Sequence, residues 1–461
     1  MLGDARYSNG NGVRMVSAAE ACIGVHCELL KWRPEELQKH RRRLGALSYR
    51  IDDPAVGEHV GATIPASVKL VGAGKVTKKS DTDARDHFGG VYAATGEVLP
   101  ESCTKRGPAG DAMCIIGPAA GHTPAPTEHI AGVGIYGGYL FRHFGHILTE
   151  TVSRLWGARL KYGKAPIYMQ SDGGKMPALA AELLDLAGLG GSIQIVKRDL
   201  SLDQVLVPEP AFVLRNRIHR VFKDLYLRMT DKALGSGPVY ASEQPLYLSR
   251  TALRDDQRPI IGELDLEEQL LRSGVRVVHT EQLPLVDQIR CINAHRTVIA
   301  PIGSALHLLL FSRIAQDVFC YTKTPPNTSY LLCDALNGSQ TRYLRTSEQG
   351  AVVEHPLLKH WEYPELLDVE CTLSLLQDQG VIDRRPERPQ RASIPPQQQY
   401  LRTYLSKALK DAARWRSLEL ASTVLDRIRE HLPDDKALLN QAEATVTHVE
   451  SKGRAEKRDT P

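Results

Sequence analysis

The chain has 461 residues, which is too long for one hydrophobic core and predicts two or three domains. Its hydrophobic content of 42% and charged content of 24% are those of an ordinary globular protein. The formal net charge of +4 is spread along the chain, and an aromatic content of 6% is low for a protein that stacks single-stranded bases, so we expect no nucleic-acid partner.

No window of the sequence approaches about 18 apolar residues, so we expect no transmembrane helix. The residues after Met1 lack the apolar stretch of a secretory signal. The eight cysteines are scattered and show neither a disulfide framework nor the spacing of a zinc site. We therefore expect reduced thiols and a cytoplasmic protein.

Residues 1–75 have no clear pattern and form an N-terminal extension. The basic run at 39–43 fits either a solvated helix face or peripheral contact with an anionic membrane surface. For a cytoplasmic protein, that surface would be the inner membrane face.

Residues 76–235 predict a first α/β domain. Its expected elements are a hairpin at 91–98, strand and loop at 132–139, an amphipathic helix at 145–161, strands at 166–170, 192–196 and 204–207, and helices at 176–187 and 218–234. Alternation of short apolar strands with helices predicts a largely parallel sheet.

Glycine and proline at 235–238 predict a domain boundary, after which residues 236–355 predict a second α/β domain. Its expected elements are strands at 246–248, 276–279, 297–300 and 317–321, and helices at 264–272, 285–293 and 304–311. This alternation is typical of a doubly wound unit, which binds ligands beyond the carboxyl ends of its strands. We therefore expect two α/β domains that face each other across a cleft.

The remaining chain predicts helices around a linker. Residues 356–383 form a returning helical segment, and residues 384–399 are rich in proline, arginine and glutamine, as linkers are. Residues 400–461 predict a helical hairpin and a tail. Because one hairpin cannot bury its apolar face alone, we expect it to dock on the main body or on a partner protein through residues 400–450.

Three polar residues, His146, Glu150 and Arg154, recur every four residues in the predicted helix and would share one face. One interpretation is a solvated stripe in which Glu150 and Arg154 form an ion pair. The other is a catalytic face, with Glu150 or alternatively His146 as general base and Arg154 in support.

Three further polar residues, Ser249, Arg250 and Glu263, come after the strand at 246–248. Ser249 and Arg250 follow it, and a guanidinium there would clamp a diphosphate bidentately, although a surface arginine fits the sequence equally well. Glu263 is either a charge in the first turn of the next helix or a carboxylate that holds ribose hydroxyls.

Gly303, Ser304 and Ala305 form the turn after the strand at 297–300. Glycine lets the backbone approach a ligand closely, and Ser304 is a good N-cap. The free N–H groups and the helix dipole at such a turn favour a phosphate, although many such turns carry Gly-Ser for capping only. His307 lies one turn further on, where an isolated histidine is usually structural.

These segments together resemble glycosyltransferase family 61. Residues 138–156, with Gly145-His146, Glu150 and Arg154-Leu155-Trp156, are similar to the first motif of that family. The second half is similar at Tyr247-Leu248-Ser249-Arg250, Arg258, Glu263-Leu264, Gln288 and Pro301-Ile302-Gly303-Ser304-Ala305. The resemblance covers about residues 89–325.

The resemblance implies two Rossmann-like domains of the GT-B type and an inverting, metal-independent transfer from a nucleotide sugar, with no cofactor. The acceptor it implies is a glycan or lipid-linked glycan in the synthesis of a bacterial capsule or other surface polysaccharide. Glu150, with His146 as the alternative, would deprotonate the acceptor. The donor-binding residues would be Ser249, Arg250, Glu263, Gly303, Ser304, Ala305 and His307.

The chain departs from the family pattern at two positions. Ile302 stands where family members commonly have histidine, and Gly262 stands where they have asparagine. Ile302 favours a rival interpretation, a non-catalytic protein that binds a nucleotide or glycan or acts as a scaffold on the same fold, whereas the joint retention of His146, Glu150 and Arg250 opposes it. A dinucleotide-dependent enzyme is opposed by the absence of a Gly-x-Gly-x-x-Gly turn.

Overall fold

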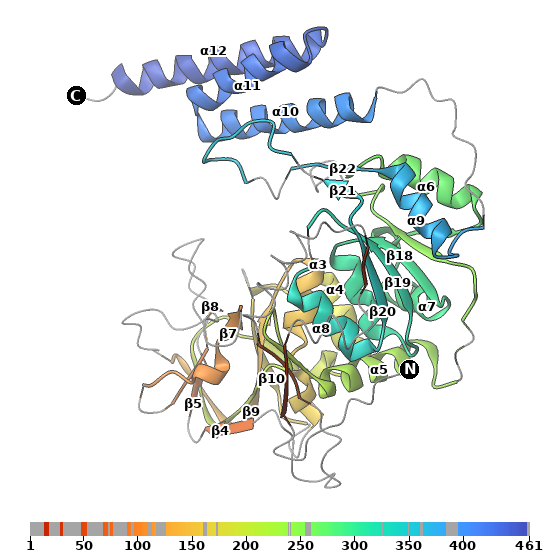
Figure 1. Ribbon diagram of the computed structural model, residues 1–461. Helices are drawn as coiled ribbons and strands as arrows, with labels where there is room; N and C mark the ends of the chain where they lie inside the picture. The colour runs from red at the N-terminus through yellow and green to blue at the C-terminus, as the bar shows by residue number, and fades with distance from the viewer. Residues whose placement is uncertain are drawn as a thin grey trace. The chain divides into compact units, whose positions relative to one another are not determined.

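The computed structural model describes most of the chain from residue 90 onward and five strands before it (Figure 1). The described residues are the strands at 13–17, 28–30, 48–52, 68–71 and 74–76, and residues 90–93, 96–107, 113–116, 126–159, 164–171, 174–237, 239, 241–253, 260–324, 326–348, 350–359, 363–383 and 395–458. The basic run at 39–43, Arg258 and residues 384–394 of the expected linker lie outside them.

Contacts within the chain define two compact units that interleave along the sequence. Unit 1 contains residues 1–245, 282–320 and 325–343, and unit 2 contains residues 246–281, 321–324 and 344–461. The sequence predicts consecutive domains with boundaries after residues 75 and 235. Those boundaries, and the GT-B arrangement, stay predictions.

The largest sheet of unit 1 has seven strands, and its centre is parallel. Across the sheet the strands are β11 (Ile193–Ile195), β10 (Ile167–Ser171), β9 (Glu128–Leu140), β12 (Leu200–Pro208), β5 (Gly74–Val76) and β6 (Val91–Ala93), with β4 (Val68–Val71) also on β12. Strands β4, β5 and β6 pair antiparallel. Helix α4 (Ala178–Leu186) returns the chain from β10 to its parallel neighbour β11. The predicted α/β layer is confirmed.

Aromatic and β-branched side chains form the core of this sheet. Val205 and Val207, two residues apart on β12, are fully buried with Tyr136 of β9, and each such side chain contributes about 1.5–3 kcal/mol by leaving water. An irregularity in the pairing with β10 places Met169 opposite Gly138 of β9. Gly138 has a φ of 89°, which favours glycine, and it lies just before the candidate site.

Unit 1 also contains smaller sheets and the helices that surround residues 303–307. A four-stranded sheet has the order β1 (Val13–Ser17), β3 (Ser48–Asp52), β14 (Arg217–His219) and β13 (Phe212–Val213), and β7 (Thr104–Arg106) pairs with β8 (Met113–Ile116). Strands β18 (Thr297–Pro301), β19 (Asp317–Tyr321), β20 (Gln340–Leu344) and β2 (Glu28–Leu30) follow one another in a further sheet. Helices α5 (Arg220–Leu234), α7 (Leu285–Asn293) and α8 (Thr328–Asn337) all contact the 3-10 helix η8 (Ser304–Phe311).

Unit 2 begins with a parallel pair of strands. Strand β15 (Leu246–Ser249) pairs with β17 (Arg276–His279), and helix α6 (Glu263–Arg272) connects them. A three-stranded sheet of β16 (Ile260–Ile261), β22 (Glu365–Leu367) and β21 (Ser347–Glu348) and helix α9 (Val369–Asp378) follow. The predicted strands at 246–248 and 276–279 and the helix at 264–272 are confirmed.

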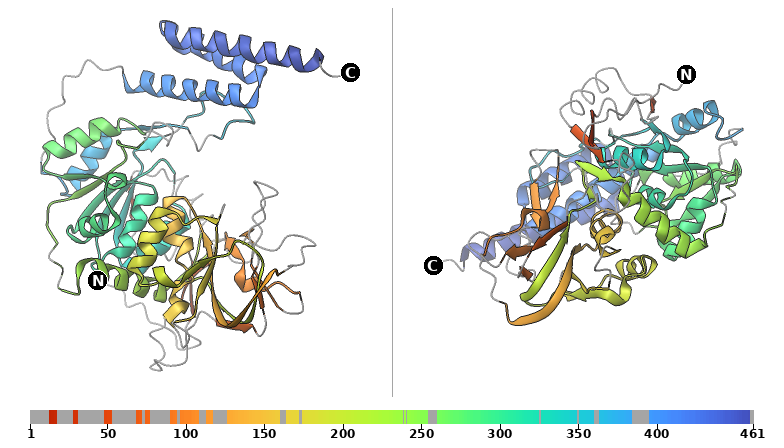
Figure 2. Two further views of the ribbon diagram at one scale, coloured as in Figure 1. Left: turned by 180° about the vertical axis from the view of Figure 1, so that it is seen from behind. Right: turned by 90° about the horizontal axis from the view of Figure 1, so that it is seen from below.

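The C-terminal part of unit 2 is three helices, where the sequence predicts a hairpin. Helices α10 (Pro396–Trp415), α11 (Leu418–His431) and α12 (Lys436–Arg458) lie side by side (Figure 2). The extra break occurs because Arg416 has a φ of 51° and the Ser417 side chain caps the next helix at Leu420.

The three helices share one hydrophobic cluster with the rest of unit 2. Tyr404 and Ala408 of α10 are fully buried in it, together with Ile261 of β16 and Tyr363, which precedes β22. Packing against the rest of unit 2 therefore buries apolar side chains of the helices, and the expected partner protein at residues 400–450 stays a prediction. No helix in the described part of the chain is long and apolar enough to cross a membrane.

Candidate functional site

The predicted helix at 145–161 is wrong as a single helix. It is one α turn, α3 (Phe144–His146), a π-helical turn, η3 (Ile147–Thr151), and a 3-10 helix, η4 (Leu155–Arg159). Side-chain hydroxyls bond the local backbone here: Thr149 Oγ1 donates to the carbonyl of Gly145 at 2.7 Å, and Ser153 Oγ donates to that of Glu150 at 2.8 Å. Such bonds compete with a regular helix, and π turns occur often at functional sites.

His146 and Glu150 contact each other, as their spacing predicts. Nδ1 of His146 lies 2.7 Å from Oε2 of Glu150. Arg106 of β7 donates two hydrogen bonds to the same carboxylate, from Nε to Oε1 at 2.9 Å and from one terminal nitrogen to Oε2 at 2.6 Å. The Glu150 side chain is 3% exposed, whereas that of His146 is 34% exposed. The carboxylate is thus enclosed, and the imidazole is the group of this trio that solvent and ligands reach most readily.

The environment of Glu150 keeps its carboxyl group ionised. Burial alone would raise the pKa of Glu150, but hydrogen bonds from His146 and Arg106 and the charge of Arg106 outweigh it, so the pKa lies below its usual value. A carboxylate of lowered pKa is a poor proton acceptor near neutral pH. As a hydrogen-bond acceptor, however, it holds the proton of a neutral His146 on Nδ1 and leaves Nε2 as the basic nitrogen.

Arg154 is buried and bonds the backbone elsewhere, so the interpretation of a solvated stripe with a Glu150–Arg154 ion pair is wrong, whereas the supporting role of Arg154 stays a prediction. It is 2% exposed, and its guanidinium donates to the carbonyls of Pro208 and Cys103 and lies 5.4 Å from the ring centre of Tyr136. Burial lowers the pKa of Arg154 to about 10. The π turn changes the angular spacing between 150 and 154, so Arg154 packs against β9, close to Gly138.

The polar stripe and the 303–307 motif meet at Gly145. A Cβ added to Gly145 would lie 2.9 Å from Oγ of Ser304 and 3.4 Å from Cδ2 of His307. The expected helix bounds of 304–311 are confirmed, although η8 is a 3-10 helix. Its N-cap is Gly303 and no side chain caps it, so the expected capping role of Ser304 is wrong; that side chain faces Gly145 instead. Ala305 follows Ser304 in the half-exposed first turn of η8.

His307 is buried and neutral at physiological pH. Its ring stacks on Tyr330 with centres 5.2 Å apart, and Nδ1 lies 3.9 Å from Sγ of Cys333. Burial, with smaller contributions from the charges of His146 and His143, lowers the pKa of His307 to about 4. A neutral, 8%-exposed imidazole packs the site and supplies no positive charge for a diphosphate.

The predicted polar residues of unit 2 also lie together. Oε1 of Glu263 accepts the backbone N–H of Arg250 at 2.8 Å and the hydroxyl of Tyr247 at 2.9 Å. Glu263 is 3% exposed, and burial raises its pKa. The Ser249 hydroxyl donates to Glu267 at 2.6 Å. Glu263 therefore holds the backbone of the strand end in this structure, and its expected contact with ribose stays a prediction.

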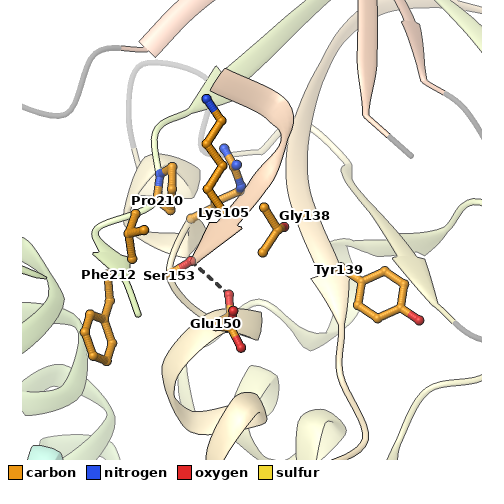
Figure 3. Close-up of a pocket in the computed structure, with 10 residues that line it drawn as sticks. Lys105, Gly138, Tyr139, Glu150, Ser153, Pro210 and Phe212 are labelled. Atoms are coloured by element: carbon orange, nitrogen blue, oxygen red, sulfur yellow. Dashed lines mark hydrogen bonds between the residues drawn. The ribbon is translucent and has the colours of Figure 1, made fainter. Parts of the chain in front are cut away.

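A small pocket lies next to Glu150 and the strand β7 (Figure 3). Its lining residues are Thr104, Lys105, Gly138, Tyr139, Glu150, Ser153, Arg154, Pro210, Phe212 and Val213. Figure 3 shows Lys105 and Glu150 on opposite sides of Ser153. Within the described ranges, no three His, Cys, Asp or Glu side chains come together in a way that would hold a metal ion.

Sequence reasoning missed Arg106, Gly145 as a contact residue, and Glu267. Arg106 lies 44 residues from Glu150 in a short strand, and nothing in its local sequence marks it. Glu267 carried a weak signal, because it follows Glu263 by four residues and so shares a helix face with it.

Comparison with known proteins supports the resemblance stated from the sequence. Residues 144–329 match the family model described as Glycosyltransferase 61. This segment, about two fifths of the chain, includes His146, Glu150, Arg250, Glu263 and the 303–307 motif, but it excludes Arg106 and the C-terminal helices. No curated protein matches the chain significantly. The match supports glycosyltransferase activity.

Proposed function

We propose that the protein is an inverting glycosyltransferase in which His146 is the general base and Glu150 orients it. The observation that carries this proposal is the 2.7 Å contact between Nδ1 of His146 and the enclosed carboxylate of Glu150, which Arg106 holds with two hydrogen bonds. The sequence favours Glu150 as base with His146 as alternative. The low pKa of Glu150 and the greater exposure of His146 favour the reverse order.

In the proposed reaction, Nε2 of His146 removes the proton from an acceptor hydroxyl. The resulting oxygen attacks the anomeric carbon of a nucleotide sugar and forms the new glycosidic bond. The bond between that carbon and the diphosphate breaks on the opposite face, and its electron pair leaves with the nucleoside diphosphate. Glu150 stabilises the imidazolium that forms, as a carboxylate does in other histidine-carboxylate pairs.

On the donor side, we propose that Arg250 holds the diphosphate and that backbone N–H groups at Gly303–Ala305 assist, without a metal ion or cofactor. The conformation of Gly303 does not itself require glycine, because its φ of 173° suits any residue and the nearest atom to an added Cβ would be 3.9 Å away. A ligand that approaches the backbone closely would explain the glycine, and this supports a ligand contact. Arg250→Ala would weaken nucleotide binding and Arg250→Lys would restore part of it. A glycan or lipid-linked acceptor in surface polysaccharide synthesis, at the cytoplasmic membrane face, completes the proposal and rests on the resemblance.

The test is a comparison of three variants in an assay of nucleoside diphosphate release. A panel of nucleotide sugars is first screened by thermal shift, because a ligand at about 100 times its Kd adds about 2.7 kcal/mol of stability. With the donor found, we expect His146→Ala to lower kcat at least about a hundredfold and Glu150→Gln to lower it less, with donor affinity kept in both.

His143→Ala is the matched control, because its ring lies 5.1 Å from that of His146 in an exposed position. We expect its kcat to stay near that of the wild type. A larger loss of kcat in Glu150→Gln than in His146→Ala would show that Glu150, and not His146, is the general base. Wild-type turnover in both variants would show that the pair is not catalytic.

A second candidate function is a non-catalytic nucleotide- or glycan-binding protein on this fold. The observation that favours it is Ile302, half-exposed beside Gly303 where family members commonly have histidine. In that case the thermal-shift panel would reveal a ligand, while the wild type would release no nucleoside diphosphate with any acceptor. Introduction of the family residue by Ile302→His would then be the natural next variant.

A further inference from the structure

Two glutamates on α6 accept hydrogen bonds from Arg250 and from the residues on either side of it. Glu263 accepts the N–H of Arg250 itself at 2.8 Å. One turn later, Oε2 of Glu267 accepts the hydroxyl of Ser249 at 2.6 Å and that of Thr251 at 2.5 Å. The residues before, at and after the predicted diphosphate ligand are therefore each bonded to a carboxylate of the same helix.

His279 of the neighbouring strand β17 contacts both Thr251 and Glu267. It is the last residue of β17 and the register partner of Ser249. Its Nε2 lies 2.9 Å from Oγ1 of Thr251 and 3.2 Å from Oε2 of Glu267. The hydroxyl of Thr251 thus meets both a carboxylate and an imidazole, and its position is fixed from two elements.

The Glu267 carboxylate has the ionised form that strong acceptors need. Burial alone would raise the pKa of Glu267, but hydrogen bonds from Ser249 and Thr251 and the proximity of His279 outweigh it and lower that pKa. Hydrogen bonds to an ionised acceptor are shorter and about twice as strong as neutral ones. The two hydrogen bonds from Ser249 and Thr251 restrict the strand end, which would otherwise lose conformational freedom on binding a ligand.

We propose that Glu267, supported by His279, is a positioning residue that fixes the direction in which Arg250 presents its guanidinium to a nucleoside diphosphate. The inference rests on the proposed donor contact of Arg250. Glu267 needs no contact with the ligand for this role. Its effect on binding therefore passes through Arg250 and disappears when that guanidinium is absent.

The experiment measures the Kd of UDP, GDP and dTDP by calorimetry for the full chain. We expect Glu267→Ala to weaken the binding of the preferred nucleotide at least about tenfold, because a small displacement of a positioning group has a large effect. The same substitution in an Arg250→Ala background should change the Kd less than twofold. Glu268→Ala is the matched control on α6, since Glu268 pairs with Arg272 at the surface, and it should bind as the wild type does.

A second pair of variants keeps the inference testable if Glu267→Ala does not fold. Thr251→Val removes the hydroxyl at nearly constant volume, and Thr251→Ser keeps it. We expect the valine variant to bind more weakly and the serine variant to bind as the wild type does. Urea unfolding of each variant separates a loss of affinity from a loss of folded protein.

The outcomes separate this inference from the proposed function. If Arg250→Ala weakens binding while Thr251→Val and Glu267→Ala do not, the positioning role is overturned and the donor role of Arg250 stands. Equal losses from Glu267→Ala with and without Arg250 also overturn it, because the effect then bypasses the guanidinium. If the wild type binds none of the three nucleotides, the proposed donor contact fails and this inference fails with it.

Discussion

At the scale of single residues, the proposed choice of His146 as the base depends on Arg106. Together with the hydrogen bond from His146, the two hydrogen bonds from the Arg106 guanidinium keep Glu150 ionised and the pKa of that carboxyl low, although the side chain is almost fully enclosed. Without Arg106, only His146 would counter the effect of burial, and the pKa of Glu150 would rise. A protonated Glu150 could no longer accept the proton of His146 Nδ1, so the orientation of the imidazole depends on Arg106.

We therefore expect Arg106→Met to move the acid limb of the kcat–pH profile to higher pH. The physical reason is that Glu150 becomes protonated at a higher pH once the guanidinium is removed. The measurement is nucleoside diphosphate release across pH 4.5–8.5. Lys105→Met, on the adjacent residue of β7, is the control and should leave the profile in place. An unshifted profile in Arg106→Met would contradict the role given to Arg106.

His307 should make the stability of the protein depend on pH. Its folded-state pKa of about 4 is below the value of 6.5 for an unfolded chain, so the unfolded state binds more protons between these values. Stability is then lost as pH falls from 6.5 towards 4, by about 2 kcal/mol between pH 7.5 and pH 5. Urea unfolding at the two pH values measures this loss.

The control for this effect is His307→Gln, which carries no titrating group. It should be less stable than the wild type at pH 7.5, because the stacking on Tyr330 is lost. Its stability should nevertheless fall less between pH 7.5 and pH 5. The same fall in both proteins would assign the pH dependence to other groups.

At the scale of elements, the sequence predicts the apolar pattern of residues 144–159 correctly and their conformation wrongly. Leu148, Val152 and Leu155 are buried, as an amphipathic segment requires. The π turn depends on local bonds such as that of Thr149 to Gly145, and on packing against η8, and neither appears in hydrophobic periodicity. Spacing therefore finds the contact between residues 146 and 150, which lies within the first turns, and misplaces Arg154 beyond the π turn.

The two glycines of the site should respond oppositely to alanine. Gly145→Ala places a Cβ within 2.9 Å of Ser304 Oγ and should cost about 1–3 kcal/mol as the two motifs separate. Gly303→Ala meets open space in an extended conformation, so the free energy of unfolding should stay within about 0.5 kcal/mol. Urea unfolding followed by circular dichroism measures both. Equal losses would show that η8 does not rest on Gly145.

At the scale of the whole molecule, alternation of strands and helices predicts the α/β layers, whereas the predicted domain boundaries after residues 75 and 235 stay predictions. Each parallel strand and its helix leave a local pattern, and the predicted strands at 166–170 and 276–279 and the predicted helix at 176–187 are confirmed. The interleaving of the two units depends on contacts between segments far apart in the chain, which a local pattern does not contain. The third C-terminal helix was missed for a smaller reason, a break at Arg416 without glycine or proline.

The C-terminal helices should contribute to the stability of unit 2 through Tyr404. This side chain is fully buried, lies 4.4 Å from the ring centre of Tyr363, and donates to the carbonyl of Val353 at 3.2 Å. Tyr404→Ala should therefore cost about 3–5 kcal/mol. Tyr404→Phe, the control, removes one hydrogen bond and should cost about 1 kcal/mol. Urea titration gives both values, and a stable alanine variant would show that the helices form no part of the core.

The interleaving of the units also has a consequence for how the protein is made. A ribosome delivers the chain from its amino end, and unit 1 is complete only when residue 343 has emerged, because residues 282–320 and 325–343 belong to it. At typical rates of synthesis, roughly 5–20 s pass between the release of residue 245 and that of residue 343. During that time α5 and η3 lack their partner η8, and the apolar side chains that would contact it are exposed to chaperones and to other nascent chains. A fragment that stops near residue 235 would remain in that state permanently.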